Sequence, residues 1–450
     1  MTFSALDSTL TGPLFATDAM RSVFSDRARL RAMLRMEAAL ARAQAGLGLV
    51  PDTLAPAIEA ISPDDLDLEA LGYGTALAGV PAIPFVKAVQ ARLPPALEPS
   101  LHKGATTQDV VDTALVLQMR EAFDLIEAEL IAILEGLSRL AAEHRDTPCA
   151  GRTYGQHAAP ITFGFKVAVW LTGVGETAAQ LPWLRQRVLV ASLGGPVGTL
   201  ASLSGNGALV VDAFAQELGL GTTPLAWHAL RARMVETGSW LSTLIGSLAK
   251  MAADVAHLTS TEVGEVAEPH VPGRGGSSAM PHKRNPVSST VILAAQAAAK
   301  GHLVTLFDAM AAAHERSAGL WHGEWHALPA LFGLASGALH EARSLAEGLA
   351  VDPDRMRANL DVTRGLLFAD AAAARLAPQI GREEAHRLVE RAAGEVRRTG
   401  EGLQAVLTRL APIPLEDAFD LRPAIEMSGI WIDRALAEAA SIRNTLSCKR

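Results

Sequence analysis

The sequence predicts an all-α protein built around an elongated bundle of long helices. Aromatic residues make up only 5% of the 450 residues, and alanine and leucine are abundant, whereas sheets favour β-branched and aromatic residues. Apolar residues recur at steps of three and four over long stretches, as they do along one face of a helix. Glycine and proline gather in the breaks between these stretches, where helices end.

The clearest helix is predicted at residues 112–144. Polar residues such as Arg120 and Glu127 occupy one face of it. A helix of about 30 residues is roughly 45 Å long, so it must pack along other long helices. Its apolar side chains form one stripe on the opposite face: Met119, Phe123, Ile126, Leu130, Ile133, Leu137 and Leu140.

Three further long helices are predicted at residues 161–188, 230–261 and 286–312. Pro160 precedes the first of them, and the first turn of a helix tolerates proline because its N–H groups have no helical partner. Helices of this length bury their stripes only against one another, which predicts the central bundle. Stripes this long exceed what one chain covers, so a homo-oligomer is expected.

Two irregular connections interrupt the bundle. Residues 194–207 are rich in glycine, and residues 268–281 combine glycine with proline. Long loops in compact proteins are commonly functional. The two ends of the chain have shorter helical patterns and more prolines. The sequence therefore predicts an N-terminal helical domain (1–105), a central bundle that carries the loop 268–286 (106–348) and a C-terminal helical domain (349–450).

Composition excludes several classes of protein. The net charge of −8 argues against a general binder of nucleic acids, and 49% hydrophobic with 20% charged residues excludes bulk disorder. Two cysteines are too few for a disulfide framework and fit a reducing cytoplasm. No secretory signal is recognisable, and the longest clean apolar run, residues 167–174, is far shorter than the roughly 20 residues that span a bilayer. A cytoplasmic protein without a membrane partner is expected.

Two histidines four residues apart, His322 and His326, raise the possibility of a metal site. Glu324 lies midway between them, whereas in zinc peptidases of the H-E-x-x-H type the acid follows the first histidine directly. The segment is therefore interpreted as a helix that lines a polar pocket, and no metal site is expected.

The most specific segment is the run GSSAMPHKRNP at residues 276–286. It places two hydroxyls, a cation and an amide beside a flexible glycine-rich turn and continues into a helix, whose N-terminus attracts anions. Taken by itself, the segment is more simply explained as a polar surface loop with a helix cap, since Ser, Lys and Asn are common in loops.

This run resembles the signature loop of the fumarase/aspartase superfamily, which follows the pattern G-S-S-x-M-P-x-K-x-N-P. HKGATTQD at residues 102–109 and GRTYGQHAAP at residues 151–160 resemble two further superfamily regions, in the same order. The resemblance spans most of the chain. It implies three helical domains, a homotetramer completed around a central bundle, and active sites shared between subunits.

The resemblance also implies roles for individual residues. Ser277 would transfer the proton, while Lys283 and Asn285 would hold the loop and stabilise negative charge. Thr106 and Thr107 would bind a substrate carboxylate in a site that His102 also lines. Such donors are needed because removing a proton next to a carboxylate creates a dianion that water stabilises poorly. The remaining residues expected to contact substrate are Arg152, Tyr154, Gln156, Ser278, Arg316 and Trp325.

Two departures indicate which branch of the superfamily the chain resembles. Tyr154 stands where adenylosuccinate lyases have a general-acid histidine, and Trp325 stands where they have a second arginine for a nucleotide phosphate. Both favour the lactone-forming cycloisomerases. In their reversible reaction the leaving group is a carboxylate, which is stable without a proton. Two roles of His157 are equally consistent with the sequence: it could position the reacting carboxylate, or it could be a structural histidine. A C–N lyase of the adenylosuccinate type and a non-catalytic scaffold remain alternatives.

The expected substrate is a small tricarboxylate, which calls for several cations. Lys283, Arg316 and His102 are the main candidates, and Arg152 and Arg231 are weaker ones because an arginine on a helix surface is usually solvated. The resemblance implies no metal or organic cofactor.

Overall fold

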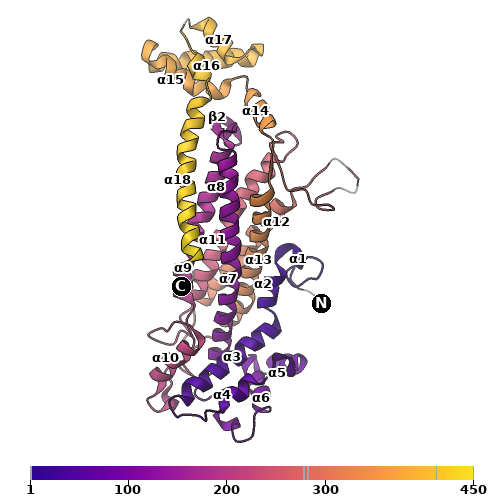
Figure 1. The fold of residues 1–450 in the computed structure, drawn as a ribbon, viewed down its shortest axis with the longest axis vertical. Helices are drawn as coiled ribbons and strands as arrows, with labels where there is room; N and C mark the ends of the chain where they lie inside the picture. The colour runs from indigo at the N-terminus through magenta and orange to yellow at the C-terminus, as the bar shows by residue number, and fades with distance from the viewer. Residues whose placement is uncertain (1–2, 277–278, 281–282, 412, 449–450) are drawn as a thin grey trace. The chain divides into compact units, whose positions relative to one another are not determined.

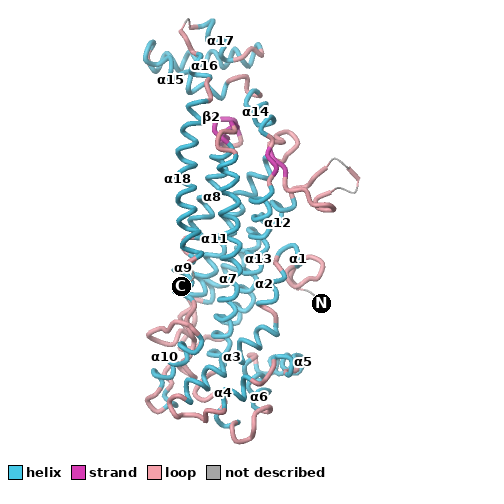
Figure 2. Tube along the Cα trace, in the orientation of Figure 1, coloured by secondary structure: helices cyan, strands magenta, loops and turns pink. Residues whose placement is uncertain are grey.

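The computed structural model describes residues 3–276, 279–280, 283–411 and 413–448. Within these ranges the helices are joined by loops and turns, and two small strand pairs are the other regular structure (Figure 2), which confirms the all-α prediction. The N-terminal helices are α1 (Gly12–Phe15), α2 (Asp18–Val23), α3 (Asp26–Ala45), α4 (Leu54–Glu59), α5 (Leu68–Ala78) and α6 (Ala82–Gln90). The middle of the chain forms α7 (Thr107–Glu143), α8 (Phe163–Ala178), α9 (Leu181–Val188), α10 (Gly207–Leu218), α11 (Ala232–Leu258), α12 (Val287–Ala309) and α13 (Leu320–Gly348). The last helices are α14 (Pro353–Asp361), α15 (Ala369–Ile380), α16 (Arg382–Thr399), α17 (Leu403–Leu410) and α18 (Arg422–Ser447).

The strands form two antiparallel pairs. β1 (Pro148–Thr153) pairs with β2 (Gln156–Thr162), and β3 (Val266–Ala267) pairs with β4 (Ala350–Val351). Short 3₁₀ turns complete the connections: η1 (Pro63–Asp65), η2 (Glu98–Ser100), η3 (Ala201–Leu203), η4 (Leu366–Phe368) and η5 (Glu416–Phe419).

The chain divides into two compact units, each assembled from three segments. Unit 1 comprises residues 1–129, 177–246 and 294–340, and unit 2 comprises residues 130–176, 247–293 and 341–450. This division groups residues by contacts in space and does not test the three domains predicted along the sequence, which stay a prediction.

Unit 1 contains the N-terminal helices and the first part of α7. In this unit α3 lies beside α4 and α10 (Figure 1). Local signals explain where α3 begins, because the Ser25 hydroxyl accepts a hydrogen bond from the Ala28 N–H at 3.2 Å and so caps the helix. A chain of aromatic contacts crosses the core of the unit from Phe24 to Phe332, Phe123 and Trp240, with ring centroids 5.3–6.0 Å apart. These aromatic contacts stabilise the packing of the long helices side by side.

Unit 2 contains the two strand pairs and the C-terminal helices. The helices α15, α16 and α17 pack into a cluster with its own apolar core, which includes Leu376, Leu388 and Leu407 (Figure 1). Gly400 ends α16 in a left-handed conformation, with φ of 81°, which is the usual way a glycine stops a helix.

The predicted long helices are present with two corrections. The segments predicted at 112–144, 230–261 and 286–312 correspond to α7, α11 and α12. The segment 161–188 is not one helix, because it begins within β2 and is divided into α8 and α9 at the turn before Pro182. The C-terminal part was expected to hold only shorter helices, and this is wrong for α18, which has 26 residues.

The helix α12 is long and apolar enough, by length and composition, to cross a membrane, and 28% of its most apolar window is buried within this chain. Composition of this kind is weak evidence for a span.

Candidate active site

Asp109, in the first turn of α7, organises the region that carries Thr106 and Thr107. Its buried carboxylate accepts hydrogen bonds from the N–H groups of Thr106, Gly194 and Gly195 at 2.8–2.9 Å. The Nε2 atom of His228 lies 2.6 Å from the same carboxylate. Asp109 therefore ties the start of α7 to the glycine-rich connection at 194–207. This role of Asp109 was not predicted, although Asp109 closes the HKGATTQD motif.

Two predicted binding residues meet in unit 1. The Arg316 guanidinium donates a hydrogen bond to the Thr106 hydroxyl. Arg316 is exposed and lies in the connection between α12 and α13, so its charge is available at the surface beside the N-terminus of α7. A cation and a helix N-terminus together favour a bound carboxylate.

His102 precedes α7 and adopts a left-handed backbone conformation, with φ of 58°. Its Nδ1 atom lies 2.6 Å from the Oε1 atom of buried Glu37. Burial by itself would lower the pKa of His102, but the Glu37 carboxylate outweighs burial, so the pKa lies above its ordinary value. The pair favours a positively charged imidazolium at this site.

This pairing predicts that stability falls as the pH rises. Because the folded-state pKa of His102 is above 6.5, the pair stabilises the folded chain fully below that pH, and this contribution is lost as the pH rises through the folded-state pKa. We expect the difference in unfolding free energy between wild type and Glu37→Gln to be largest below about pH 6.5 and to shrink as the pH rises through the raised pKa of His102. Urea unfolding at several pH values measures it, with Glu59→Gln as a control for an exposed glutamate. A difference that does not change with pH would contradict the assignment.

The second motif forms the β1–β2 hairpin, which was not predicted from the sequence. Tyr154 and Gly155 make its two-residue turn, with φ of 50° and 75°, as type I′ turns require. The Tyr154 side chain is fully exposed, and Gln156, which pairs with Thr153, is exposed too. Within the described residues of this chain, the tip of the hairpin thus presents its side chains to the outside.

Arg152 and His157 face each other across the hairpin. The Arg152 guanidinium binds both carboxylate oxygens of fully buried Glu265, and Asn359 donates a further hydrogen bond to that carboxylate at 2.8 Å. The Nδ1 atom of His157 is buried and has no hydrogen-bond partner among the described residues. Burial, followed by the charge of Arg152, lowers the pKa of His157, so its imidazole is neutral near pH 7.

The signature loop has a paired stem. The Asn285 N–H donates to the Gly275 carbonyl at 2.9 Å, and Gly276 bridges Arg284. Gly275 has a φ of 69°, and a Cβ atom there would lie 2.7 Å from the Asn285 carbonyl oxygen, so this position requires glycine. The side chains of Lys283 and Asn285 are exposed. Ser277 and Ser278 lie outside the described residues.

The N-terminus of α12 is already occupied by a carboxylate of the same chain. Glu268 accepts hydrogen bonds from the N–H groups of Ser288 and Ser289 at 2.9 Å and from the Ser289 hydroxyl at 2.7 Å. Beside it, the Glu341 carboxylate binds Arg274 and the Ser288 hydroxyl. The expectation that this helix end attracts an external anion is therefore corrected, because Glu268 satisfies its donors. Both contacts instead fix the base of the loop.

Trp321 and Trp325 stack edge to face on α13, with ring centroids 4.9 Å apart. The Trp321 indole N–H donates to Asp112 at 2.9 Å. The Trp325 indole N–H has no such acceptor, because its Nε1 atom is buried without a hydrogen-bond partner in the described part of the chain. The His322 ring packs against Trp325, and its Nε2 atom lies 3.1 Å from the Gly79 carbonyl oxygen.

Arg231 is buried and structural rather than a binder of substrate. Its guanidinium makes ion pairs with Asp112 and Glu324, and the side chains of all three are about 1% exposed. The Glu324 of the His322–His326 segment thus points into the unit and binds an arginine. Groups of three or more potential metal ligands are not found within the described residues.

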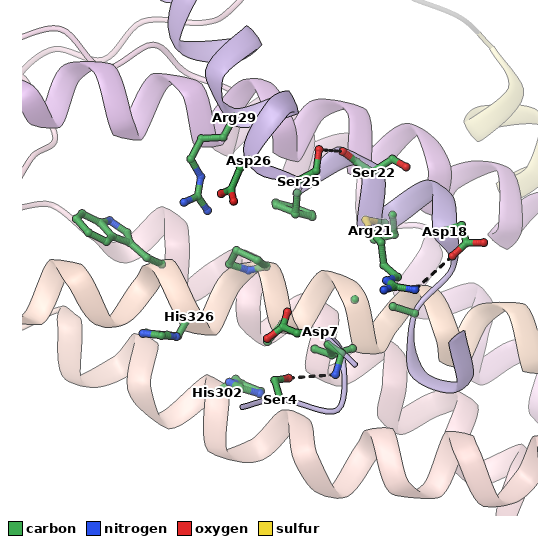
Figure 3. Close-up of a pocket in the computed structure, with 18 residues that line it drawn as sticks. Ser4, Asp7, Asp18, Arg21, Ser22, Ser25, Asp26, Arg29, His302 and His326 are labelled. Carbon is green, nitrogen blue, oxygen red and sulfur yellow. Dashed lines mark hydrogen bonds and ion pairs between the residues drawn. The ribbon is translucent and has the colours of Figure 1, made fainter. Parts of the chain in front are cut away.

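A cavity of about 840 Å³ lies in unit 1 beside Trp325 and Pro329. Figure 3 shows Arg29 and Asp26 on one wall and His302 and His326 on the other. Burial lowers the pKa of His302, and the neighbouring His326 lowers it further. The prediction that the segment around His322 and His326 lines a polar pocket holds for His326.

The predicted site residues fall into two groups. Unit 1 holds His102, Thr106, Thr107, Arg316 and Trp325, and the structure joins Thr106 to Arg316. Unit 2 holds Arg152, Tyr154, Gln156, His157, Lys283 and Asn285. Three buried carboxylates of the site were not predicted from the sequence: Glu37, Asp109 and Glu265. Glu37 and Glu265 are distant in sequence from the motif residues that they hold. Asp109 lies inside a motif but has no distinctive signal of its own.

Comparisons with known proteins agree on one family. A family model described as a lyase matches residues 14–301. A 3-carboxy-cis,cis-muconate cycloisomerase of Pseudomonas aeruginosa is 48% identical over 435 residues, which cover 94% of this chain and 95% of that protein. A nitrosuccinate lyase of Streptomyces davaonensis is 42% identical, with 96% and 95% covered. The crystal structure of the 3-carboxy-cis,cis-muconate lactonizing enzyme of Pseudomonas putida superposes with a TM-score of 0.92 at 44% identity, with 97% and 100% covered.

Proposed function

Because the chain belongs to this lyase family, within the fumarase/aspartase superfamily, we propose that it converts 3-carboxy-cis,cis-muconate to 4-carboxymuconolactone. In this reaction one substrate carboxylate adds to the distant double bond and forms a C–O bond. The electron pair of that double bond moves to the adjacent carbon, which then gains a proton. No atom leaves the molecule, and the reaction belongs to the protocatechuate branch of the β-ketoadipate pathway.

The observation that carries this proposal is the aromatic pair on α13. Trp325 stands where adenylosuccinate lyases have a second arginine for the nucleotide phosphate. Trp321 stacks on it and is fixed by its hydrogen bond to Asp112. Neither indole carries the positive charge that the second arginine offers a phosphate, whereas both suit a flat, conjugated substrate. The fully exposed Tyr154 likewise replaces the general-acid histidine that an amine leaving group needs.

The proposed roles follow the chemistry of the developing charge. The carbon that receives the electron pair and the carboxylate attached to it together form a dianionic aci-carboxylate, and Ser277 delivers the proton to that carbon. Lys283 and Asn285 stabilise that charge from the loop, and Ser278 binds beside them. In unit 1, Thr106 and Thr107 bind a carboxylate at the start of α7, supported by Arg316 and by the imidazolium of His102.

Arg152 is better suited to positioning than to direct binding. Its guanidinium is held by Glu265 at both oxygens, so its donors are engaged in this chain. We assign it the task of holding the hairpin and the neutral imidazole of His157. His157 then offers a ring nitrogen to the lactonising carboxylate, with Gln156 and Tyr154 beside it at the tip of the hairpin.

A homotetramer with shared active sites fits the exposed surfaces. Val304 and Phe307 on α12 are 60% and 53% exposed, and only 28% of the apolar window of this helix is buried within one chain. Apolar faces of this extent mark interfaces, and the occupant proposed here is a second copy of the chain. The projecting Tyr154 turn would then reach a site on another subunit. We place the enzyme in the cytoplasm, where Cys149 and Cys448 stay reduced.

An ultraviolet assay with 3-carboxy-cis,cis-muconate tests the proposal. We expect rapid loss of the diene absorbance, unchanged by a chelator, from protein that light scattering shows to be a tetramer. Adenylosuccinate and nitrosuccinate should give no product in the same assay. Elimination from either compound, with no lactonisation, would move the assignment to a C–N lyase, and no turnover of any of the three would favour a non-catalytic scaffold.

A further inference from the structure

Arg29 on α3 and Trp325 on α13 border the same hollow region of unit 1. Both line the cavity of about 840 Å³ and an adjoining cavity of about 270 Å³. Figure 3 shows the Arg29 side chain extending from α3 into this space, opposite His302 and His326. Arg29 was not part of any motif, so its place here is a result of the tertiary structure.

Both residues offer N–H groups that nothing in the described chain accepts. The Nε1 atom of Trp325 is buried and has no hydrogen-bond partner there. The partly buried Arg29 guanidinium makes neither a hydrogen bond nor an ion pair with any described residue. Asp26 lies one turn earlier and lines the same cavities, yet it does not pair with Arg29. By contrast, Arg21 in the larger cavity is paired with Asp18 at 3.4 Å.

A buried donor without a partner beside an unpaired cation favours a ligand that accepts hydrogen bonds and carries negative charge. The walls next to them are apolar, since Met33, Leu71, Pro81 and Phe85 line the 270 Å³ cavity together with Trp325. A ligand that matches both features has a carboxylate at one end and a flat, unsaturated carbon skeleton at the other. The His302 imidazole, whose pKa is lowered, adds no permanent charge.

We propose that Arg29 and the Trp325 indole N–H together bind one carboxylate of an unsaturated polycarboxylate substrate. The proposal rests on the function proposed above and adds a residue that selects the substrate. Arg29 donates through its planar fork to the carboxylate oxygens, and Trp325 donates one further hydrogen bond while its ring packs on the conjugated skeleton.

Removing the guanidinium tests this subsite. We expect Arg29→Gln to raise KM for 3-carboxy-cis,cis-muconate about 10- to 100-fold, the usual effect of losing a hydrogen bond from a charged donor, while kcat changes less than about threefold. Arg29→Lys should recover part of the affinity because it keeps the charge. Trp325→Phe, which keeps the ring but removes the N–H, should raise KM by a smaller factor. Circular dichroism and light scattering establish that each variant is folded and keeps its oligomeric state.

Arg21→Gln is the matched control, because Arg21 lines the same large cavity but already has a partner. An equal rise of KM in Arg21→Gln would overturn the proposal, since it would show a general effect of charge. An unchanged KM in Arg29→Gln, or a dissociated oligomer, would overturn it as well.

A binding measurement separates this subsite from the proposed reaction. Calorimetry with cis,cis-muconate, which carries two carboxylates on the same skeleton, needs no turnover. If the wild type does not lactonise 3-carboxy-cis,cis-muconate, the proposed function fails, and the subsite is still judged by this titration. Binding that weakens in Arg29→Gln but not in Arg21→Gln supports the subsite, and binding that is equal in all three proteins refutes it.

Discussion

Replacing Ser277 with alanine is expected to lower kcat for 3-carboxy-cis,cis-muconate by about 10²- to 10⁴-fold, the range that a positioned proton-transfer group contributes. The nucleophile of the reaction is an ionised carboxylate and needs no base, so one group carries the proton. Alanine removes that oxygen and little else. Substrate affinity should therefore stay close to the wild-type value, because Lys283, Thr106 and Arg316 remain.

The measurement combines the ultraviolet assay for kcat with calorimetry for the dissociation constant. Ser202→Ala is the control, because Ser202 is an exposed serine in η3. A near-normal kcat in Ser277→Ala would refute the serine assignment. A loss of affinity equal to the loss of kcat would show that Ser277 binds substrate instead of moving the proton.

Replacing Arg231 with methionine is expected to destabilise the fold by about 3–5 kcal/mol, the usual cost of leaving a buried charge without its partner. Arg231 holds both Asp112 and Glu324 at sites that are about 1% exposed, and the Trp227 ring lies 4.9 Å from the guanidinium carbon. Burial already raises the pKa of Glu324 against the opposing charge of Arg231. Without the arginine, two carboxylates would be buried with no cation.

Urea unfolding measures this loss, and its pH dependence identifies the cause. The deficit of Arg231→Met should shrink at acidic pH, because burial already raises the pKa of Glu324 and its protonation removes a buried charge that the variant leaves without a cation. Arg21→Met is the control, since its partner Asp18 is 92% exposed and such pairs contribute little. A deficit in Arg231→Met no larger than in the control would contradict the buried triad.

The helices could be predicted because their signal is local. The apolar residues at steps of three and four in α7 and α11 specify a helix and its buried face without reference to the rest of the chain. The β1–β2 hairpin was missed because its strands are short and mix glycine, alanine and proline with polar residues. Gly155 was the available signal, because glycine readily adopts the positive φ that a tight hairpin turn requires.

The candidate site could be predicted only as a set of motif residues. Motif order indicated Thr106, Arg152, Ser277 and Arg316, but it did not indicate what they contact. The sequence gives no sign that Arg152 and Arg231 have different partners. In the structure, Glu265 binds the first and Asp112 with Glu324 binds the second. Charged side chains need such partners when they are buried, and burial is a property of the whole fold.

By itself, the sequence determined that the protein is helical and that it carries the superfamily motifs, because helical periodicity and a contiguous loop motif depend only on neighbouring residues. The tertiary structure decided which charges are free and which are engaged. It placed Glu268 on the N-terminus of α12, Glu37 beside His102, and Arg29 beside Trp325 with no acceptor among the described residues. These outcomes depend on residues that are distant in sequence, since ion pairs and cavities form only where separate segments of the chain pack together.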